Sequence, residues 1–299
     1  MIDSLRQVQV VGALARLAGN GGWAEILAGE PLQGTLDVAD ARLLIAADVL
    51  HEHADGRLEP VELHPWYDDP SVLASGLTAE LRRALRHGTG ADQPTGGDPD
   101  EIVAMGMASQ SVAAILAEAV LPLLTQTRDR FADGTARFLD VGVGTGAIAE
   151  TLCRRFPGTR AVGLDISQEA LTMARDRMSA ASLEHRVELR ELSVVDLDDV
   201  DLYDLAWVPQ VFLARDDLER GLHRVLASLR SGGWLVMPVA APGDDCSRLE
   251  AAAVAHDAAL RGGGAMSVES ALALLTSAGF EDAWDMRGVS QSLTFARKP

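Results

Sequence analysis

The sequence contains little cysteine and no long apolar run. Only two cysteines occur among the 299 residues, Cys153 and Cys246, and their wide separation is not a metal-ligand spacing. A membrane helix needs roughly 18 or more apolar residues in succession, and the sequence has no such stretch. The N-terminus lacks the basic start and the sustained apolar segment of a signal peptide. These absences predict a cytoplasmic protein that has no membrane partner.

Positive charge is also scarce. Lysine and arginine total 26 against 44 acidic residues, which gives a formal net charge of −18, and Lys298 is the only lysine. Such a surface repels the phosphate backbone of nucleic acids. We therefore expect no nucleic-acid partner.

The composition changes once along the chain, at a segment rich in Gly, Pro and Asp. Residues 88–100 have no apolar periodicity, which is typical of a linker or a long loop. The sequence therefore predicts a first region at 1–87 and a second at 101–299. Apolar residues recur at helical spacing from Ile102 onward, and Pro122 is expected to kink or end that helix.

The first region is predicted to be mostly helical. Apolar residues at helical spacing indicate helices at 5–18, 23–28 and 37–49, followed by an Asp55-Gly56 turn and a short extended run. We interpret this region as a cap over a substrate or as a dimerisation region.

The second region alternates between strands and helices, which predicts a doubly wound, mostly parallel α/β sheet covered on both faces. Its end differs, because a helix is followed by two strands with a short connection, which suggests an antiparallel pair at one edge. The expected strands are 136–141, 160–166, 187–192, 205–209, 234–239, 283–286 and 292–296, and the expected helices are 147–155, 168–178, 216–229 and 268–278.

A glycine-rich turn follows the first of these strands. Gly142 permits a tight turn, Gly144 lets a ligand approach the backbone, and Gly146 lets the next helix pack closely against the strand. The N–H groups at such a helix start bind a phosphate or a carboxylate. The same segment, taken as Gly142-x-Gly144-x-x-Ala147, also satisfies the dinucleotide fingerprint, so an NAD-dependent oxidoreductase is an alternative.

Acidic residues near three strand ends distinguish these cofactors. Asp140 lies directly before the turn, where it disfavours a pyrophosphate and favours an ammonium group. Asp165 ends the second strand, where a ribose diol is held in folds of this type, and Asp196 follows the third strand. Asp196 belongs to an acidic run, so a solvated loop residue is nearly as good an interpretation of it.

The glycine loop and the ordered acids resemble the class I S-adenosylmethionine-dependent methyltransferases of the small-molecule type. The resemblance covers about residues 102–299 and implies a Rossmann-like sheet of seven strands with S-adenosyl-L-methionine as the cofactor. The first region also resembles, in the lengths of its elements, the winged-helix dimerisation domain of many such enzymes, which implies a homodimer. Carried over by position, the cofactor-binding residues are Asp140, Gly142, Gly144, Gly146, Asp165, Ile166 and Asp196.

Ligands of open α/β sheets bind outside the carboxyl ends of the strands, so the tip of the fourth strand is expected to face the substrate. The candidates there are Trp207, Gln210 and Phe212, although Trp207 and Phe212 are also natural core residues. In related O-methyltransferases a histidine base follows this strand, and Leu213 stands in that place here. No catalytic base can therefore be named from the sequence.

Histidines in the first region raise the question of a metal site. His51 and His53 have a spacing that can bind a metal, and His64 lies nearby, but no fourth ligand can be named. We expect no metal and interpret these histidines as exposed residues near a turn.

These observations predict an enzyme that transfers a methyl group from S-adenosylmethionine to a small, largely apolar acceptor, such as a secondary metabolite. The acceptor atom (O, N or C) stays open. Two alternatives stay open as well: an NAD-dependent oxidoreductase, and a cofactor-binding module without catalysis.

Overall fold

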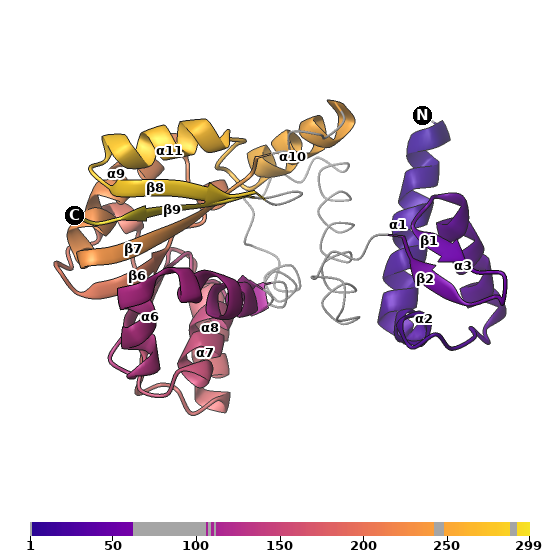
Figure 1. Ribbon diagram of the computed structural model, residues 1–299, viewed down its shortest axis with the longest axis horizontal. Helices are drawn as coiled ribbons and strands as arrows, with labels where there is room; N and C mark the ends of the chain where they lie inside the picture. The colour runs from indigo at the N-terminus through magenta and orange to yellow at the C-terminus, as the bar shows by residue number, and fades with distance from the viewer. Residues whose placement is uncertain (1, 62–105, 107–108, 111, 242–247, 288–291) are drawn as a thin grey trace. The chain divides into compact units, whose positions relative to one another are not determined.

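A computed structural model describes residues 2–61, 106, 109–110, 112–241, 248–287 and 292–299 (Figure 1). The chain divides into two compact units, one containing residues 2–61 and the other containing residues 112–299. The predicted boundaries at residues 87 and 101 lie outside the described residues, so the linker stays a prediction.

In its described residues, 2–61, the first unit has three helices followed by a hairpin. Its elements are α1 (Ile2–Asn20), α2 (Gly22–Leu27), α3 (Thr35–Ala46), β1 (Leu50–Glu52) and β2 (Leu58–Pro60). The two strands pair antiparallel around the predicted turn, where Gly56 has a φ of 83°. Trp23, Ile26 and Leu44 are buried in a small core of this unit. The helical region that was expected is therefore present, with one additional strand before the turn.

The second unit is built on one seven-stranded sheet. Its strands are β3 (Arg137–Val141), β4 (Arg160–Asp165), β5 (Val187–Glu191), β6 (Tyr203–Trp207), β7 (Leu229–Val239), β8 (Glu281–Met286) and β9 (Ser292–Arg297). Their order across the sheet is β5-β4-β3-β6-β7-β9-β8. The first five are parallel, and β9 inserts antiparallel between β7 and β8. The mostly parallel fold with an antiparallel edge is confirmed.

Helices cover both faces of this sheet, as Figure 1 shows. On one face lie α6 (Thr125–Ala132), α7 (Ala147–Arg155) and α8 (Gln168–Ala180), and on the other lie α9 (Arg215–Ser228) and α11 (Val268–Ser277). Another helix, α10 (Arg248–Leu260), precedes α11 in the chain.

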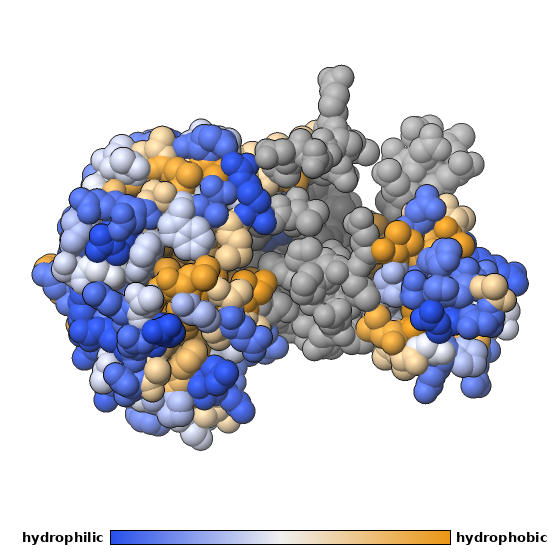
Figure 2. All heavy atoms as spheres, viewed as in Figure 1, coloured by the Kyte–Doolittle hydropathy of each residue, from blue (hydrophilic) through white to orange (hydrophobic). Residues whose placement is uncertain are grey.

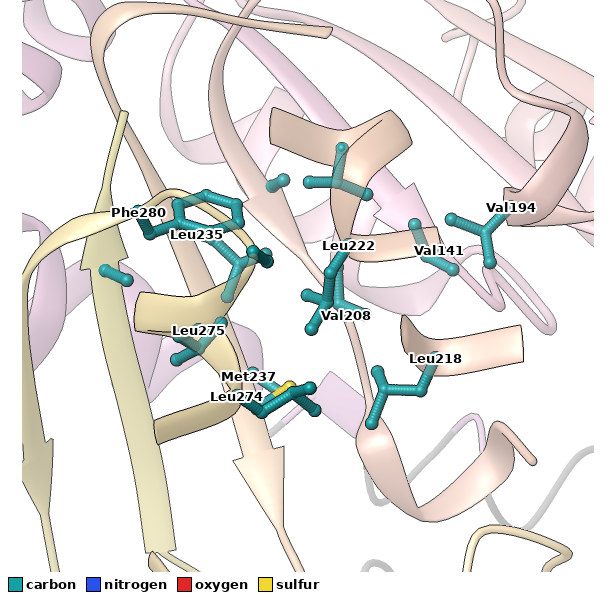
Figure 3. Packing of buried hydrophobic residues seen from close by; sticks show 14 of the residues in the cluster. Val141, Val194, Val208, Leu218, Leu222, Leu235, Met237, Leu274, Leu275 and Phe280 are labelled. Atoms are coloured by element: carbon teal, nitrogen blue, oxygen red, sulfur yellow. The ribbon is translucent and has the colours of Figure 1, made fainter. Parts of the chain in front are cut away.

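The core on the α9 and α11 face is almost entirely aliphatic. Leu274 and Leu275 of α11 pack with Met237 of β7, and Leu222 of α9 packs near Val208 (Figure 3). Along β7, Leu235 and Met237 face this core and Val236 faces the core on the opposite side, because successive side chains of a strand point to opposite faces. This packing holds the strand ends at a fixed edge of the sheet.

The bounds of the expected helices and strands lie within three residues of the prediction, except at the start of β7. The strand β7 begins at Leu229, five residues earlier than expected, because Leu229 pairs with Tyr203 before the register shifts. The glycine-containing stretch after it therefore belongs to the strand. Before the sheet, the helical residues 112–115 continue into a π turn at Leu116–Val120 and a 3-10 turn at Leu121–Leu123, and Pro122 lies in that last turn, where the helix was expected to kink or end.

Hydrophilic residues cover most of the second unit on the face shown in Figure 2, with hydrophobic patches between them. Within the part of the chain that the structure describes, no helix is long and apolar enough to cross a membrane.

Candidate functional site

The glycine loop connects the carboxyl end of β3 to α7. Gly142, Gly144 and Gly146 have φ values of 68°, 53° and 78°, a region that side chains rarely adopt. A Cβ atom added at Gly144 would find only the Gly142 carbonyl, at 4.0 Å, and one at Gly142 would find only Pro209, at 3.7 Å. Open space therefore lies above these two glycines, where a ligand can approach the backbone.

Gly146 has a different role from the first two glycines. It precedes α7 as the N-cap residue, and a Cβ atom there would lie 2.8 Å from Cε of Met178 in α8. Close packing is present at this position, but its partner is the neighbouring helix α8, whereas the strand was expected.

Asp165 joins the glycine loop to the second strand. Its Oδ2 accepts a hydrogen bond from the Gly144 amide at 2.9 Å, and its Oδ1 accepts one from the Ser167 amide at 2.9 Å. Ser167 in turn caps α8 by accepting a hydrogen bond from the Ala170 amide. Asp165 thus shapes the loop itself, besides standing where a ribose diol was expected.

Asp140 lies in the interior, below the loop. It pairs in register with Gly163 of β4 and Trp207 of β6, and its side chain is 1% exposed. Burial and, to a smaller extent, the nearby charge of Asp165 raise the pKa of Asp140 to about 8, and the Ala149 amide acts in the opposite direction. The carboxyl group is therefore mostly protonated at neutral pH.

Buried polar atoms without a hydrogen-bond partner gather at this edge of the sheet. Among the described residues there are five such side-chain atoms, and four belong to Asp140 (both oxygens), Thr145 and Gln210. Leaving a buried polar atom unpaired costs about 1–3 kcal/mol, so native proteins rarely tolerate it without reason. Thr145, a member of the glycine loop, was not predicted from the sequence, because only the glycines of the loop carry a recognisable pattern.

The residues predicted near a substrate have three different environments. Trp207 is 6% exposed and packs in the core on the α7 face, and Phe212 is 37% exposed with the Arg261 guanidinium 5.5 Å from its ring centre. Leu213, which replaces the expected histidine, packs against the core of the α9 face. Gln210 is fully buried, and it alone of these residues offers an unpaired polar atom to the site.

Gln210 also holds a second glycine-rich loop. Its Nε2 donates to the carbonyl oxygens of Gly263 and Gly264 at 3.1 and 3.0 Å, so its Oε1 must point elsewhere. The Gly263 amide donates to the Val211 carbonyl at 2.9 Å. The 262–264 loop is therefore docked on the tip of β6.

Two further predicted cofactor residues are accessible to solvent. Ile166 directly follows β4 and is 77% exposed, which is unusual for a large apolar side chain. Asp196 is exposed at the end of a 3-10 turn (Val194–Asp196), five residues after the last residue of β5. The structure thus brings Asp165 and the glycines together, and it gives Asp196 no partner within the described part of the chain.

The remaining reactive groups give no competing site. His51 and His53 contact each other edge to face, and His53 pairs with Glu59 at 2.9 Å, while His64 lies outside the described residues. In the described ranges no three metal-ligating side chains cluster. Cys153 is a buried free thiol, and burial raises its pKa to about 11, so it is not a nucleophile at neutral pH.

Residues 139–235, which run from β3 through the glycine loop into β7, match the family model of a methyltransferase domain. The sheet order, with the antiparallel strand β9 between β7 and β8, agrees with this match. The second unit has the fold of the class I methyltransferases, and its residues 139–235 match a methyltransferase domain. The family of this domain uses S-adenosylmethionine as its methyl donor.

Curated relatives match the methyltransferase domain over part of their length. Malonyl-[acyl-carrier protein] O-methyltransferase of Acetivibrio thermocellus is 31% identical over 100 residues, 32% of this chain and 33% of the relative. Trans-aconitate 2-methyltransferase of Variovorax paradoxus is 35% identical over 108 residues, 34% of this chain and 38% of the relative. The chain thus matches about a third of the length of these relatives.

Solved structures match over the whole chain. Human N-acetylserotonin methyltransferase in complex with S-adenosylmethionine has a TM-score of 0.64 at 19% identity and covers 99% of this chain and 96% of its own. CalO1, a methyltransferase in calicheamicin biosynthesis, has a TM-score of 0.61 at 19% identity and covers 100% of this chain and 97% of its own. At this identity the likeness establishes the fold, including that of the first unit.

Proposed function

We propose that this protein transfers a methyl group from S-adenosylmethionine to a small-molecule acceptor. The observation that carries the proposal is the group of unpaired buried atoms of Asp140, Thr145 and Gln210 around an open glycine loop, in a methyltransferase domain. The names of the solved neighbours, which include N-acetylserotonin and mitomycin 7-O-methyltransferases, support a small acceptor such as a secondary metabolite.

The methionine end of the cofactor fits the glycine loop. Gly142 and Gly144 leave space for a ligand against the backbone, and the first amides of α7 favour a carboxylate. Asp140 has both oxygens unpaired beneath the loop, so an ammonium group nearby would stabilise the carboxylate form and lower the pKa of Asp140. We assign Gly142, Gly144 and Gly146 to the shape of this subsite and Asp140 to its charge.

The adenosine end fits the edge formed by β4 and β5. Asp165 has lone pairs remaining after its two backbone hydrogen bonds, and these can accept from ribose hydroxyls. Ile166 offers an exposed apolar surface beside it, on which an adenine ring can stack. Asp196 is assigned to the adenine amino group on position alone.

When bound, the cofactor supplies an electrophilic methyl group on a sulfonium. The chain's contribution is to orient the acceptor and to exclude water, which is worth up to about 7–11 kcal/mol in favourable cases. Gln210 is the residue best placed to orient an acceptor, because its unpaired Oε1 can accept from an O–H or N–H group. Because Leu213 stands where related enzymes have a histidine, we propose orientation without that base.

We further propose that the protein acts in the cytoplasm and that the first unit supports a homodimer. The homodimer is supported by the three helices and the hairpin described in the first unit, and by the whole-chain likeness to the solved methyltransferases. The proposed partner is a small molecule, and the net charge of −18 argues against nucleic acid.

Isothermal titration with S-adenosylhomocysteine and with NAD tests the cofactor assignment. We expect binding of the first and none of the second. Ile166→Ser should weaken the binding of S-adenosylhomocysteine about fivefold, since it removes roughly 1 kcal/mol of apolar contact. Val200, also apolar and 67% exposed, provides the matched control Val200→Ser, which should bind as the unmodified protein does. Exclusive NAD binding would refute the proposal.

Catalysis needs a second assay. Transfer of a radiolabelled methyl group to a panel of small phenols, amines and carboxylic acids is the expected result. Cofactor binding without any transfer would favour the alternative of a binding module without catalysis.

A further inference from the structure

A cavity of about 270 Å³ lies at the end of the sheet opposite the glycine loop. The first residues of β3, β4, β5 and β6 line it, namely Arg137, Arg160, Val187 and Tyr203. Because these strands are parallel, their amino ends meet here while their carboxyl ends meet at the cofactor site. The length of β3, at about 3.3 Å per residue, places the two sites about 13 Å apart.

The cavity gathers arginines in a protein that is otherwise strongly acidic. Arg137, Arg160 and Arg186 line it, together with His185. Within the described ranges none of these three guanidinium groups has a carboxylate partner, although arginines elsewhere in the domain, such as Arg177 and Arg230, do. Unpaired guanidinium groups around one hollow favour an anionic ligand.

The acidic residues of the same cavity are engaged elsewhere. Glu188 accepts from Arg190 at 2.7 Å. Glu184 has a lowered pKa because its carboxylate accepts from its own amide and from the Ser179 hydroxyl. Both carboxylates keep their charge, so the three arginines and two glutamates of the lining leave a net charge of +1 around the cavity.

Arg186 is held in place by the backbone. Its Nη1 donates to the Cys153 carbonyl at 2.7 Å, in the last turn of α7, where carbonyl groups lack helical partners. This contact uses one of the five donors of the guanidinium and fixes its position, so the other donors stay available. A fixed donor group loses little entropy when a ligand binds.

We propose that this cavity binds an anion of the phosphate type, either free or on a small phosphorylated molecule. Several guanidinium groups around one hollow suit the oxygen atoms of a phosphate, which accept two hydrogen bonds from one arginine. The volume lies just below the 300–1,000 Å³ usual for sites of drug-sized ligands, so it suits a small ligand rather than a nucleotide cofactor. This site is separate from the cofactor site and does not depend on the proposed methyl transfer.

The test is calorimetric titration of the full chain with inorganic phosphate at constant ionic strength. We expect saturable binding of phosphate that sulfate displaces and that chloride does not reproduce. Arg137→Gln and Arg160→Gln should each weaken phosphate binding about tenfold, the lower range for losing a hydrogen bond to a charged group. Malonate as a second probe distinguishes a phosphate site from one for dicarboxylates, since tighter malonate binding would refute the phosphate assignment.

Arg224→Gln is the matched control, because Arg224 is exposed on α9, away from the cavity, and no ion pair holds it among the described residues. This variant should bind phosphate unchanged. Equal affinity in all the variants, or a response that chloride reproduces, would overturn the proposal. Binding of S-adenosylhomocysteine by Arg137→Gln and Arg160→Gln shows that the variants are folded and separates this outcome from failure of the proposed function.

Discussion

Asp140 and Asp204 are both buried, lie on the adjacent strands β3 and β6, and have opposite surroundings. Asp204 is 3% exposed and accepts from the Arg137 amide at 2.8 Å and from Arg230 at 3.1 Å, with Arg130 at 3.2 Å. Asp140 is 1% exposed and has no hydrogen-bond partner. One carboxylate is charged and fully paired, and the other is kept neutral by burial.

This difference indicates that the amino end of the sheet stabilises the fold and that the carboxyl end binds a ligand. At the amino end, the Asp204 carboxylate ties α6, β3 and β7 to β6, so its charge stabilises the fold. At the carboxyl end, burying Asp140 costs stability, because its two oxygens have no hydrogen-bond partner among the described residues. Unsatisfied groups persist in proteins where a ligand completes them, which is why we place the cofactor at the carboxyl end.

The largest expected effect concerns Asp140. Its pKa is about 8 in the folded chain and near 3.9 when unfolded, so between these values the folded state binds one more proton. Stability from this group is therefore lost as the pH rises, by about 1.4 kcal/mol per pH unit, or roughly 4 kcal/mol between pH 5 and pH 8.

Asp140→Asn should remove this dependence, because the amide does not ionise. Urea unfolding of both proteins at several pH values measures the effect, and the variant should be the more stable of the two at pH 8. Parallel stability profiles from pH 5 to pH 8 would show that Asp140 is charged in the folded chain.

The paired aspartate should respond in the opposite direction. Asp204→Ala removes a buried acceptor from two arginines and one amide and should lower the free energy of unfolding by about 3 kcal/mol. Asp129 provides the control, since its pair with Arg128 is exposed and Asp129→Ala should change stability by less than about 1 kcal/mol. Thermal and urea unfolding measure both, and equal losses would mean that the Asp204 pairs are as weak as surface pairs.

A smaller effect is expected at Asp165. Asp165→Ala removes the acceptor of the Gly144 amide and should weaken binding of S-adenosylhomocysteine by about tenfold to a hundredfold, as expected for losing hydrogen bonds to a charged group. Asp165→Asn keeps one acceptor oxygen and should lose less. Titration calorimetry gives the affinities.

Asp196 and Asp198 form a matched pair for this comparison, because both are exposed acids of one loop. We expect Asp196→Ala to bind the cofactor product a few-fold more weakly and Asp198→Ala to bind it unchanged. Identical behaviour of the two variants would remove Asp196 from the site.

The strands of the sheet could be predicted from the sequence because parallel strands are buried on both faces and appear as short apolar runs. The run ending at Asp165 and the alternation around Phe138 are examples. The early start of β7 could not be predicted, because Gly232 and Gly233 resemble a loop and only pairing with Tyr203 and the C-terminal strand keeps them in the sheet.

The sequence predicts which residues lie at the candidate site, but it does not predict which atoms they contact. The order of Asp140, the glycines and Asp165 indicated the edge of the sheet that would gather them. No local pattern shows that Asp165 accepts from Gly144, that Thr145 is an unpaired loop residue, or that Gln210 holds a loop more than 50 positions away. These facts depend on distances between segments that only the folded sheet brings together.

Gly163 limits the routes by which this domain can evolve. A Cβ atom at this position would lie 2.6 Å from Cγ2 of Val143. Any residue other than glycine at position 163 would therefore push Val143, and with it the glycine loop, away from β4. Lineages that retain the loop in its place are therefore expected to keep glycine at 163. Ile166, three positions later and largely exposed, is expected to drift among apolar residues.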